Sequence, residues 1–225
     1  MALPPRQLAL SLDHAERLTR EDFLPGASNE AALAMIERWP EWPSPALAIA
    51  GPEGSGKSHL AAIWADRAGA RIVSAEMMHT DTLPEALATG ALVVEHCAAG
   101  GFDERALFHL LNLVREQSAA LLITARGVPS SWAVTLPDLA SRLRALPTVS
   151  MAAPDDALLR AVTVKLFADR QLAVDEALVS YLLTRVGRSF AAIRTAVQTL
   201  DREALQRKRP VNRALAAELF RNFQP

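Results

Sequence analysis

Cysteine is almost absent from this sequence. Cys97 is the only cysteine among 225 residues, so the chain cannot form an internal disulfide bond. A chain without disulfides is typical of a reducing compartment. Residues 1–6 (MALPPR) also lack the basic start and apolar core of a signal peptide. We therefore expect a cytoplasmic protein.

Long hydrophobic runs are missing as well. Runs such as 119–123 have the length of a strand, whereas a membrane-spanning helix needs about 20 apolar residues. The sequence is nevertheless 50% hydrophobic, which excludes a disordered chain, because disordered chains are poor in apolar residues. Its length suits one large domain, or a core with a small satellite.

A large net charge of either sign is also lacking. The chain has 24 basic and 25 acidic residues, for a net charge of −1. Residues 151–225 hold 12 basic and 8 acidic residues, an excess too small to predict DNA binding by itself. We expect neither a membrane partner nor more than indirect contact with DNA.

Five short apolar runs are expected to form strands, and helical stretches lie between them. The runs are 46–50, 71–75, 91–95, 121–124 and 148–151. The clearest helices are expected at 29–38, 59–68 and 103–117, where apolar residues recur at helical spacing. This alternation predicts an α/β fold, with a parallel sheet covered by helices.

The pattern changes after residue 152. Helical stretches follow near 155–171, 175–185, 189–207 and 211–222, without a strand signal. We expect three parts: an N-terminal arm (1–13), an α/β core (14–152) and a small all-helical lid (153–225).

The strongest motif lies between the first predicted strand and the next helix. Residues 51–58 read GPEGSGKS and match the phosphate-binding loop pattern G-x-x-x-x-G-K-[ST] at every position. Glycines let backbone N–H groups face the phosphates, and the helix N-terminus adds its positive end. A chance glycine-rich turn is the alternative, and the flanking strand and helix argue against it. The predicted nucleotide-binding residues are Gly51, Pro52, Gly54, Ser55, Gly56, Lys57, Ser58 and His59.

Particular roles follow from the chemistry of such loops. Lys57 would reach the β- and γ-phosphates, and the Ser58 hydroxyl would bind Mg²⁺. Glu95, at the end of the run 91–95, supplies the carboxylate that organises Mg²⁺ and water; its alternative is an ordinary carboxylate at a strand end. His96 follows, where many active ATPases of this type have a second carboxylate, so we expect weak intrinsic hydrolysis.

Several segments together resemble a known family. Residues 23–29 (FLPGASN), the loop 51–58, 106–112 (ALFHLLN) and 136–143 (LPDLASRL) resemble the AAA+ core of the bacterial replication initiator DnaA. They are more specifically similar to the Hda-type regulators, short DnaA homologues that inactivate it. The resemblance implies a P-loop AAA+ core followed by a helical lid. The chain reaches Pro225 directly after the predicted lid, so we expect a regulator without the initiator's C-terminal DNA-binding domain.

The resemblance also assigns roles to single residues. Thr124 matches the sensor-1 position beside the γ-phosphate, Arg142 the arginine finger, and Arg188 the sensor-2 arginine of the lid. The segment on the adenine side corresponds to Phe23, Gly26 and Asn29. Without the resemblance, Thr124 reads as a strand end and the two arginines as solvated side chains.

The resemblance further implies a function. Hda-type proteins present an arginine to ATP held by DnaA, and a finger supplied in trans can raise the rate by about 10³–10⁵-fold. The implied protein binds ADP or ATP with Mg²⁺, stimulates hydrolysis of DnaA-bound ATP and prevents re-initiation. Two alternatives remain, a self-contained ATPase of helicase-loader type and a non-catalytic, nucleotide-gated adaptor. A homodimer is also compatible with the sequence.

The N-terminal arm carries one more motif. Residues 7–12 (QLALSL) resemble the short Q-L-x-L-x-L motif that docks on the sliding clamp, the β subunit of DNA polymerase. An extended peptide can place alternate leucines in a hydrophobic cleft while the glutamine fixes the register. The alternative is an edge strand of the chain's own domain. The predicted clamp-binding residues are Gln7, Leu8, Leu10 and Leu12.

Overall fold

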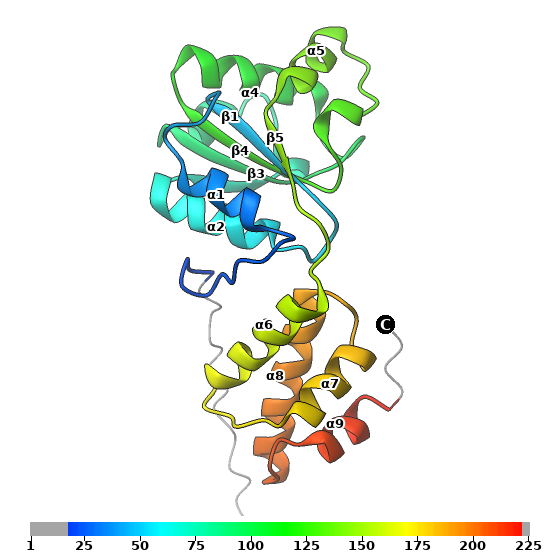
Figure 1. The fold of residues 1–225 in the computed structure, drawn as a ribbon. Helices are drawn as coiled ribbons and strands as arrows, with labels where there is room; N and C mark the ends of the chain where they lie inside the picture. Colours follow the sequence, from blue (N-terminus) through cyan, green and yellow to red (C-terminus); the bar gives the residue numbers. More distant parts are fainter. Residues whose placement is uncertain (1–17, 222–225) are drawn as a thin grey trace, which may run out of the picture. The chain divides into compact units, whose positions relative to one another are not determined.

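The structure is a computed structural model that describes residues 18–221. The described chain divides into two compact units, residues 18–155 and residues 156–221. Each unit has a hydrophobic core of its own, and Figure 1 shows a sheet with helices in the first and helices alone in the second.

The first unit is built on a five-stranded parallel sheet. Its strands are β1 (Ala46–Ala50), β2 (Arg71–Ser74), β3 (Ala91–Cys97), β4 (Ala120–Ala125) and β5 (Thr148–Ser150). They lie in the order β2-β3-β4-β1-β5, and every neighbouring pair is parallel. The predicted α/β class and its parallel sheet are therefore confirmed, and each of the five apolar runs forms a strand.

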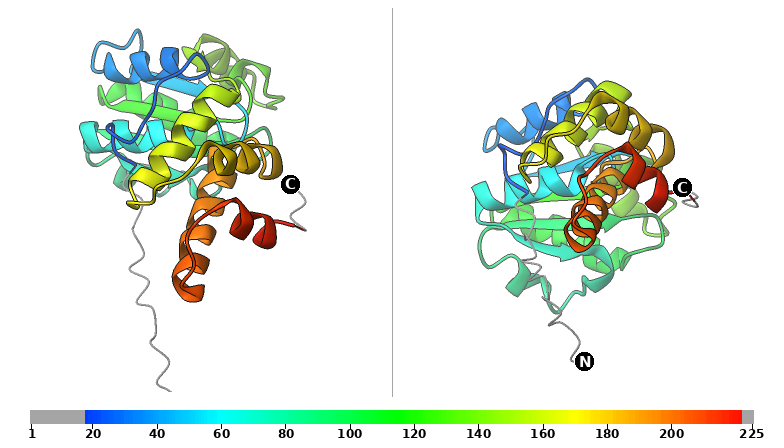
Figure 2. Two further views of the ribbon diagram at one scale, coloured as in Figure 1. Left: turned by 60° about the horizontal axis from the view of Figure 1, so that its bottom comes forward. Right: turned by 90° about the horizontal axis from the view of Figure 1, so that it is seen from below.

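Helices cover both faces of this sheet (Figures 1 and 2). One layer contains α1 (Glu30–Glu37) and α2 (Lys57–Ala68), and the other contains α3 (Leu83–Ala86), α4 (Glu104–Glu116) and α5 (Pro137–Ala145). Two 3₁₀ turns, η1 (Ala75–Met77) and η2 (Pro129–Ser131), lie in the connections. In β4, Leu121 and Ile123 face the layer of α4, whereas Leu122 faces that of α1 and α2. Burial of alternate residues on opposite faces explains why these strands read as continuous apolar runs.

Two strands run further than predicted. The strand at 91–95 does not end at Glu95, because β3 continues to Cys97. Val94 pairs with Ile123 and Cys97 pairs with Ala125, so β3 has one residue more than β4 between these pairs. His96 has a φ of 61°, and the extra residue forms a β-bulge. Similarly, β4 does not end at Thr124 but at Ala125.

Helix α5 was not among the expected helices. It begins with Pro137 in its first turn, where a fixed φ and a missing N–H are tolerated. Leu139 and Leu143, four residues apart, are both buried against the sheet. A helix of nine residues offers too few turns for its periodicity to stand out in the sequence.

The second unit contains four helices, as predicted. They are α6 (Asp156–Ala168), α7 (Glu176–Arg185), α8 (Phe190–Arg207) and α9 (Arg213–Leu219). Side chains such as Phe167, Leu182 and Leu200 fill their common core. Within residues 156–221 there is no strand, and α9 is shorter than the expected 211–222. Across residues 18–221 no helix combines the length and apolar character needed to cross a membrane.

Candidate functional site

The loop between β1 and α2 has the backbone that a phosphate-binding loop requires. Gly54 and Gly56 have φ values of 73° and 97°, in the left-handed region that favours glycine. A Cβ on Gly51 would lie 2.7 Å from the carbonyl oxygen of Met151. The Gly51 N–H donates to the Ala125 carbonyl at 3.0 Å, which anchors the loop to the end of β4.

Lys57 lies in the first turn of α2, directly after this loop. Its Nζ donates to the carbonyl oxygens of Gly51 at 2.8 Å and of Pro52 at 2.7 Å. Burial lowers the pKa of Lys57, and the positive charge of Arg126 acts in the same direction, whereas Glu53 and Glu95 raise it. The ammonium group is therefore held at the loop among charged neighbours of both signs.

Two buried oxygen atoms beside the loop have no protein partner. Among the described residues, the buried atoms Ser55 Oγ and Glu95 Oε1 form no hydrogen bond, either as donor or as acceptor. Buried polar atoms in native proteins almost always have a partner. The Ser55 hydroxyl suits a phosphate oxygen, and the Glu95 carboxylate suits Mg²⁺ or its water. The residues present thus fit a nucleotide with Mg²⁺, and Ser58 in the first turn of α2 is a second candidate ligand for the metal.

The bulge in β3 connects His96 with Thr124 on the neighbouring strand. The His96 N–H donates to Thr124 Oγ1 at 3.2 Å, and Thr124 is buried. The Thr124 hydroxyl accepts this bond and keeps its own proton for another acceptor. Cys97 follows the bulge, and burial raises the pKa of its thiol to about 12, so it acts as a small core residue.

The segment before α1 lies against the start of α2. Phe23 is buried and meets the His59 ring edge-on at 5.2 Å between centroids, and His59 Nε2 lies 2.8 Å from the Thr19 carbonyl oxygen. The Asn29 side chain accepts from the Gly26 N–H at 2.8 Å and donates to the Leu24 carbonyl at 3.1 Å. Phe23 and His59, both predicted to bind the nucleotide, are therefore in contact.

Arg142 lies on α5 beside α4. Its guanidinium carbon lies 5.0 Å from the ring centroid of Phe108, a cation–π contact. No carboxylate within residues 18–221 pairs with it. The turn before α5 is held by Glu104, whose carboxylate accepts from the N–H groups of Thr135 and Leu136 and from the Thr135 hydroxyl. These bonds lower the pKa of Glu104.

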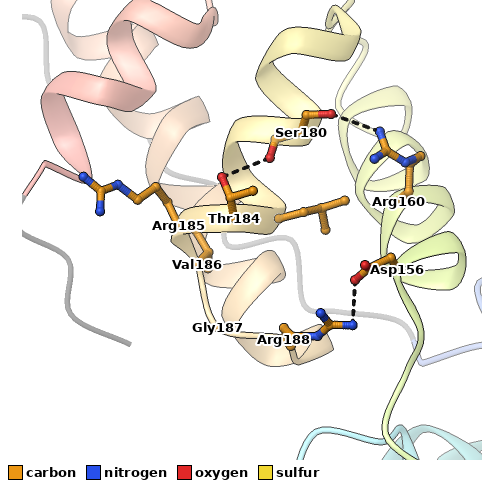
Figure 3. Close-up of a pocket in the computed structure, with 9 residues that line it drawn as sticks. Asp156, Arg160, Ser180, Thr184, Arg185, Val186, Gly187 and Arg188 are labelled. Carbon is orange, nitrogen blue, oxygen red and sulfur yellow. Dashed lines mark hydrogen bonds and ion pairs between the residues drawn. The ribbon is translucent and has the colours of Figure 1, made fainter.

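Arg188 belongs to the second unit, just before α8. Its guanidinium pairs with Asp156 at 2.7 Å, and both side chains are about two-thirds exposed. The two residues line a cavity of about 500 Å³ together with Arg160 and Arg185. Figure 3 shows the pair and these two arginines. Arg160 is paired with Glu176 at the start of α7. Two of the three arginines that line this cavity, Arg160 and Arg188, are therefore already paired with carboxylates.

Comparison with solved structures relates this geometry to known proteins. Domain III of the replication initiation protein DnaA from Thermotoga maritima matches with a TM-score of 0.76 and 19% identity, over 92% of this chain and 98% of that chain. The chain has the fold of DnaA domain III. DnaA from Aquifex aeolicus bound to AMPPCP matches with a TM-score of 0.66 and 18% identity, over 85% of this chain and 68% of that chain.

A second group of similar structures comes from a different protein. The Holliday junction branch migration motor RuvB of Thermotoga maritima matches with a TM-score of 0.69 and 13% identity, over 90% of this chain and 70% of that chain. The sequence matches no protein-family model and no curated protein. The predicted fold, an α/β core with a parallel sheet followed by an all-helical part, is confirmed, and it is shared with DnaA domain III and RuvB.

The DnaA-like fold brings together part of the predicted site. Glu95 and Thr124 lie near the carboxyl ends of β3 and β4, Lys57 and Ser58 lie in the first turn of α2, and Ser55 lies in the loop between β1 and α2. Arg142 is on α5 and Arg188 is in the other unit. The predicted clamp-binding residues Gln7, Leu8, Leu10 and Leu12 lie outside the described residues.

The sequence did not reveal two charged contacts near the site. Arg126 Nη2 pairs with Glu53 Oε2 at 2.7 Å, and Glu104 holds the turn before α5. Arg126 comes two residues after Thr124, and this spacing was the available signal. This spacing indicates a contact between Arg126 and Glu53 only if β4 lies next to β1, and the order of the strands cannot be predicted from the sequence alone.

Proposed function

We propose that this chain binds ADP or ATP with Mg²⁺ and regulates the initiation of DNA replication, as an Hda-type homologue of DnaA. The observation that carries the nucleotide part is the loop 51–58, with left-handed Gly54 and Gly56 and the partnerless buried Ser55 hydroxyl. A DnaA of similar fold has been solved with AMPPCP, an adenine nucleotide analogue. Adenine nucleotide binding is therefore the first property to test.

The roles within the site follow from the groups present. Lys57 would bind the β- and γ-phosphates, while Ser58 and Glu95 hold Mg²⁺. Thr124 would donate its hydroxyl proton to the terminal phosphate. Phe23 would line the adenine side of the site, and Arg188 of the lid would contribute a further cation. Bound Mg²⁺ neutralises phosphate charge; the protein groups orient the nucleotide around it.

Arg142 is proposed to act on another protein's nucleotide. An arginine finger must keep its guanidinium available, and Arg142 is stacked on the Phe108 ring rather than paired with a carboxylate within the described chain. A cation–π contact fixes the side chain without neutralising it. In our proposal Arg142 inserts beside ATP held by DnaA and stabilises the charge of the transition state.

Docking on the sliding clamp is proposed for residues 7–12. Deletion of residues 1–12 should abolish binding to the clamp, because the alternate leucines and the glutamine are then lost, and should leave ATP affinity unchanged. Surface plasmon resonance with immobilised clamp measures the first property, and calorimetric titration with ATP measures the second. Clamp binding that survives the deletion would show that another surface docks.

The experiment that tests the proposed function is phosphate release from ATP-loaded DnaA. The mixture contains this protein, ADP, Mg²⁺ and DNA-loaded clamp, and the control mixtures omit one protein component at a time. We expect acceleration only in the complete mixture. Fast turnover by this protein alone would instead support a self-contained motor, as the structurally similar RuvB is for branch migration. Binding to DnaA or to the clamp without acceleration would support the non-catalytic adaptor.

A further inference from the structure

Glu53 places a negative charge in the phosphate-binding loop. It is the only acidic residue of the segment 51–58, and a carboxylate there repels a polyphosphate. In the structure its Oε2 atom lies 2.7 Å from Nη2 of Arg126. The arginine therefore compensates the one charge of the loop that opposes phosphate binding.

The backbone fixes Arg126 at this edge of the sheet. It directly follows Ala125, the last residue of β4, whose carbonyl oxygen accepts the Gly51 N–H at 3.0 Å. Thr124, two residues earlier, has its hydroxyl beside the bulge of Glu95 and His96. Arg126 thus starts from the strand end that borders the region of Lys57, Thr124 and Glu95.

The charges of Arg126 and Lys57 interact. The positive charge of Arg126 is, after burial, the second cause that lowers the pKa of Lys57. Two cations that repel one another thus lie beside the loop 51–58, in which Gly54 and Gly56 have left-handed backbone conformations. A polyphosphate relieves this repulsion because it offers acceptors to both groups.

The ion pair itself is easily exchanged. The side chains of Arg126 and Glu53 are 71% and 80% exposed, and pairs this exposed contribute little to folding stability. A guanidinium binds phosphate as readily as carboxylate, with two parallel hydrogen bonds to either group. Arg126 can therefore change partners at small cost.

We propose that Arg126 is a phosphate ligand of its own chain's nucleotide, which exchanges Glu53 for the terminal phosphate of a nucleoside triphosphate. This inference rests on the proposed nucleotide binding. The terminal phosphate of a bound triphosphate would lie on the side of Glu95 and Thr124, where Ser58 and Glu95 would hold Mg²⁺. A diphosphate lacks this group, so Arg126 then stays with Glu53. The pair selects ATP over ADP.

Calorimetric titration of the full chain with Mg-ATP and Mg-ADP tests the selection. Arg126→Gln should weaken ATP binding about tenfold and ADP binding less than about twofold. Glu53→Gln should strengthen ATP binding about threefold, because a competitor and a repelling charge are removed. The matched control is Arg71→Gln, which removes another exposed arginine paired with a carboxylate, Glu85 at 3.2 Å; both affinities should stay unchanged.

Inorganic tripolyphosphate, which carries no adenosine, gives an independent readout. It should displace bound ADP less well from Arg126→Gln than from the wild-type protein, because ADP does not use the contact with Arg126. Equal losses for ATP and ADP, or an unchanged ratio of the two affinities, would overturn the assignment of Arg126 while leaving nucleotide binding intact. A wild-type protein that binds neither nucleotide would overturn both proposals. Urea unfolding of each variant shows whether a lost affinity reflects a lost fold.

Discussion

At the scale of single residues, Lys57 is the group on which the proposed nucleotide binding depends most. It is one of only three lysines in the chain, and its ammonium group contacts the loop carbonyls of Gly51 and Pro52. These two hydrogen bonds stabilise the folded protein, but the desolvation of the half-buried ammonium group opposes that stabilisation. Lys57 therefore contributes more to phosphate binding than to folding.

Lys57→Ala should weaken ATP binding about 100-fold, because charge-assisted hydrogen bonds to phosphate are lost. The free energy of unfolding should change by less than about 1 kcal/mol. Lys165→Ala is the control, since Lys165 pairs with Asp169 on the lid surface. Calorimetric titration and urea unfolding measure the two quantities. Similar ATP affinities for both variants would exclude Lys57 as the phosphate ligand.

His96 sets the backbone of the β3 bulge, and its φ of 61° is unfavourable for most residues. Asparagine tolerates this region, whereas β-branched residues do not. His96→Val should lower the free energy of unfolding by about 1–2 kcal/mol, and His96→Asn should stay within about 0.5 kcal/mol of the wild type. If the two variants have equal free energies of unfolding in urea, the bulge does not constrain the residue at position 96.

At the scale of elements, α4 positions α5 through Glu104. The Glu104 carboxylate accepts hydrogen bonds from two backbone N–H groups and one hydroxyl group of the turn that leads into α5. Arg142 on α5 also stacks on Phe108 of α4. The two helices therefore present the proposed arginine finger as one unit.

The hydrogen bonds that Glu104 accepts predict that the stability of the protein depends on pH. Hydrogen bonds from Thr135 and Leu136 lower the pKa of Glu104 below its ordinary value of 4.5. A carboxyl group with a lowered folded-state pKa stabilises the protein fully above 4.5, and this contribution is lost as the pH falls through the lowered pKa. Glu104→Gln should be less stable than the wild type at pH 7, and the difference should narrow in acid.

Urea unfolding over a range of pH measures this difference. Glu116→Gln, an exposed glutamate at the other end of α4, is the control and should follow the wild type throughout. A difference between Glu104→Gln and the wild type that stays constant with pH would contradict a role for the ionised carboxylate.

Most of the helices and strands could be predicted from the sequence. Strands of a parallel sheet are buried on both faces, so they appear in the sequence as continuous apolar runs. Each of the five runs forms a strand, and α4 follows the spacing of Leu107, Leu110 and Leu111. The bulge at His96 was not predictable, because an extra residue exists only relative to the partner strand. The short helix α5 lacks enough turns to show a period.

The site was predictable where one continuous segment forms it. The loop 51–58 is such a segment, since its glycines and Lys57 are fixed by local geometry. The contact of Glu53 with Arg126 joins residues that are 73 positions apart. It follows from β4 lying beside β1, a property of the whole sheet rather than of either segment.

At the scale of the whole molecule, the chain combines a sheet unit and a helical unit in the architecture of DnaA domain III. Most groups that are proposed to bind the nucleotide lie in the first unit, and Arg188 with its arginine-lined cavity lies in the second. In the proposed function the nucleotide bound by this chain organises the protein, while the hydrolysed ATP belongs to DnaA. The proposed function therefore depends on the action of Arg142 on DnaA-bound ATP.

The most direct test compares Arg142→Ala with Arg144→Ala in the phosphate-release assay with ATP-loaded DnaA and DNA-loaded clamp. Both arginines lie on α5, and Arg144 is exposed. We expect Arg142→Ala to lose the stimulation by about 10³-fold or more while ATP binding by this chain is unchanged, and Arg144→Ala to stimulate like the wild type. Stimulation that is retained in Arg142→Ala would contradict the claim that this arginine acts on DnaA-bound ATP.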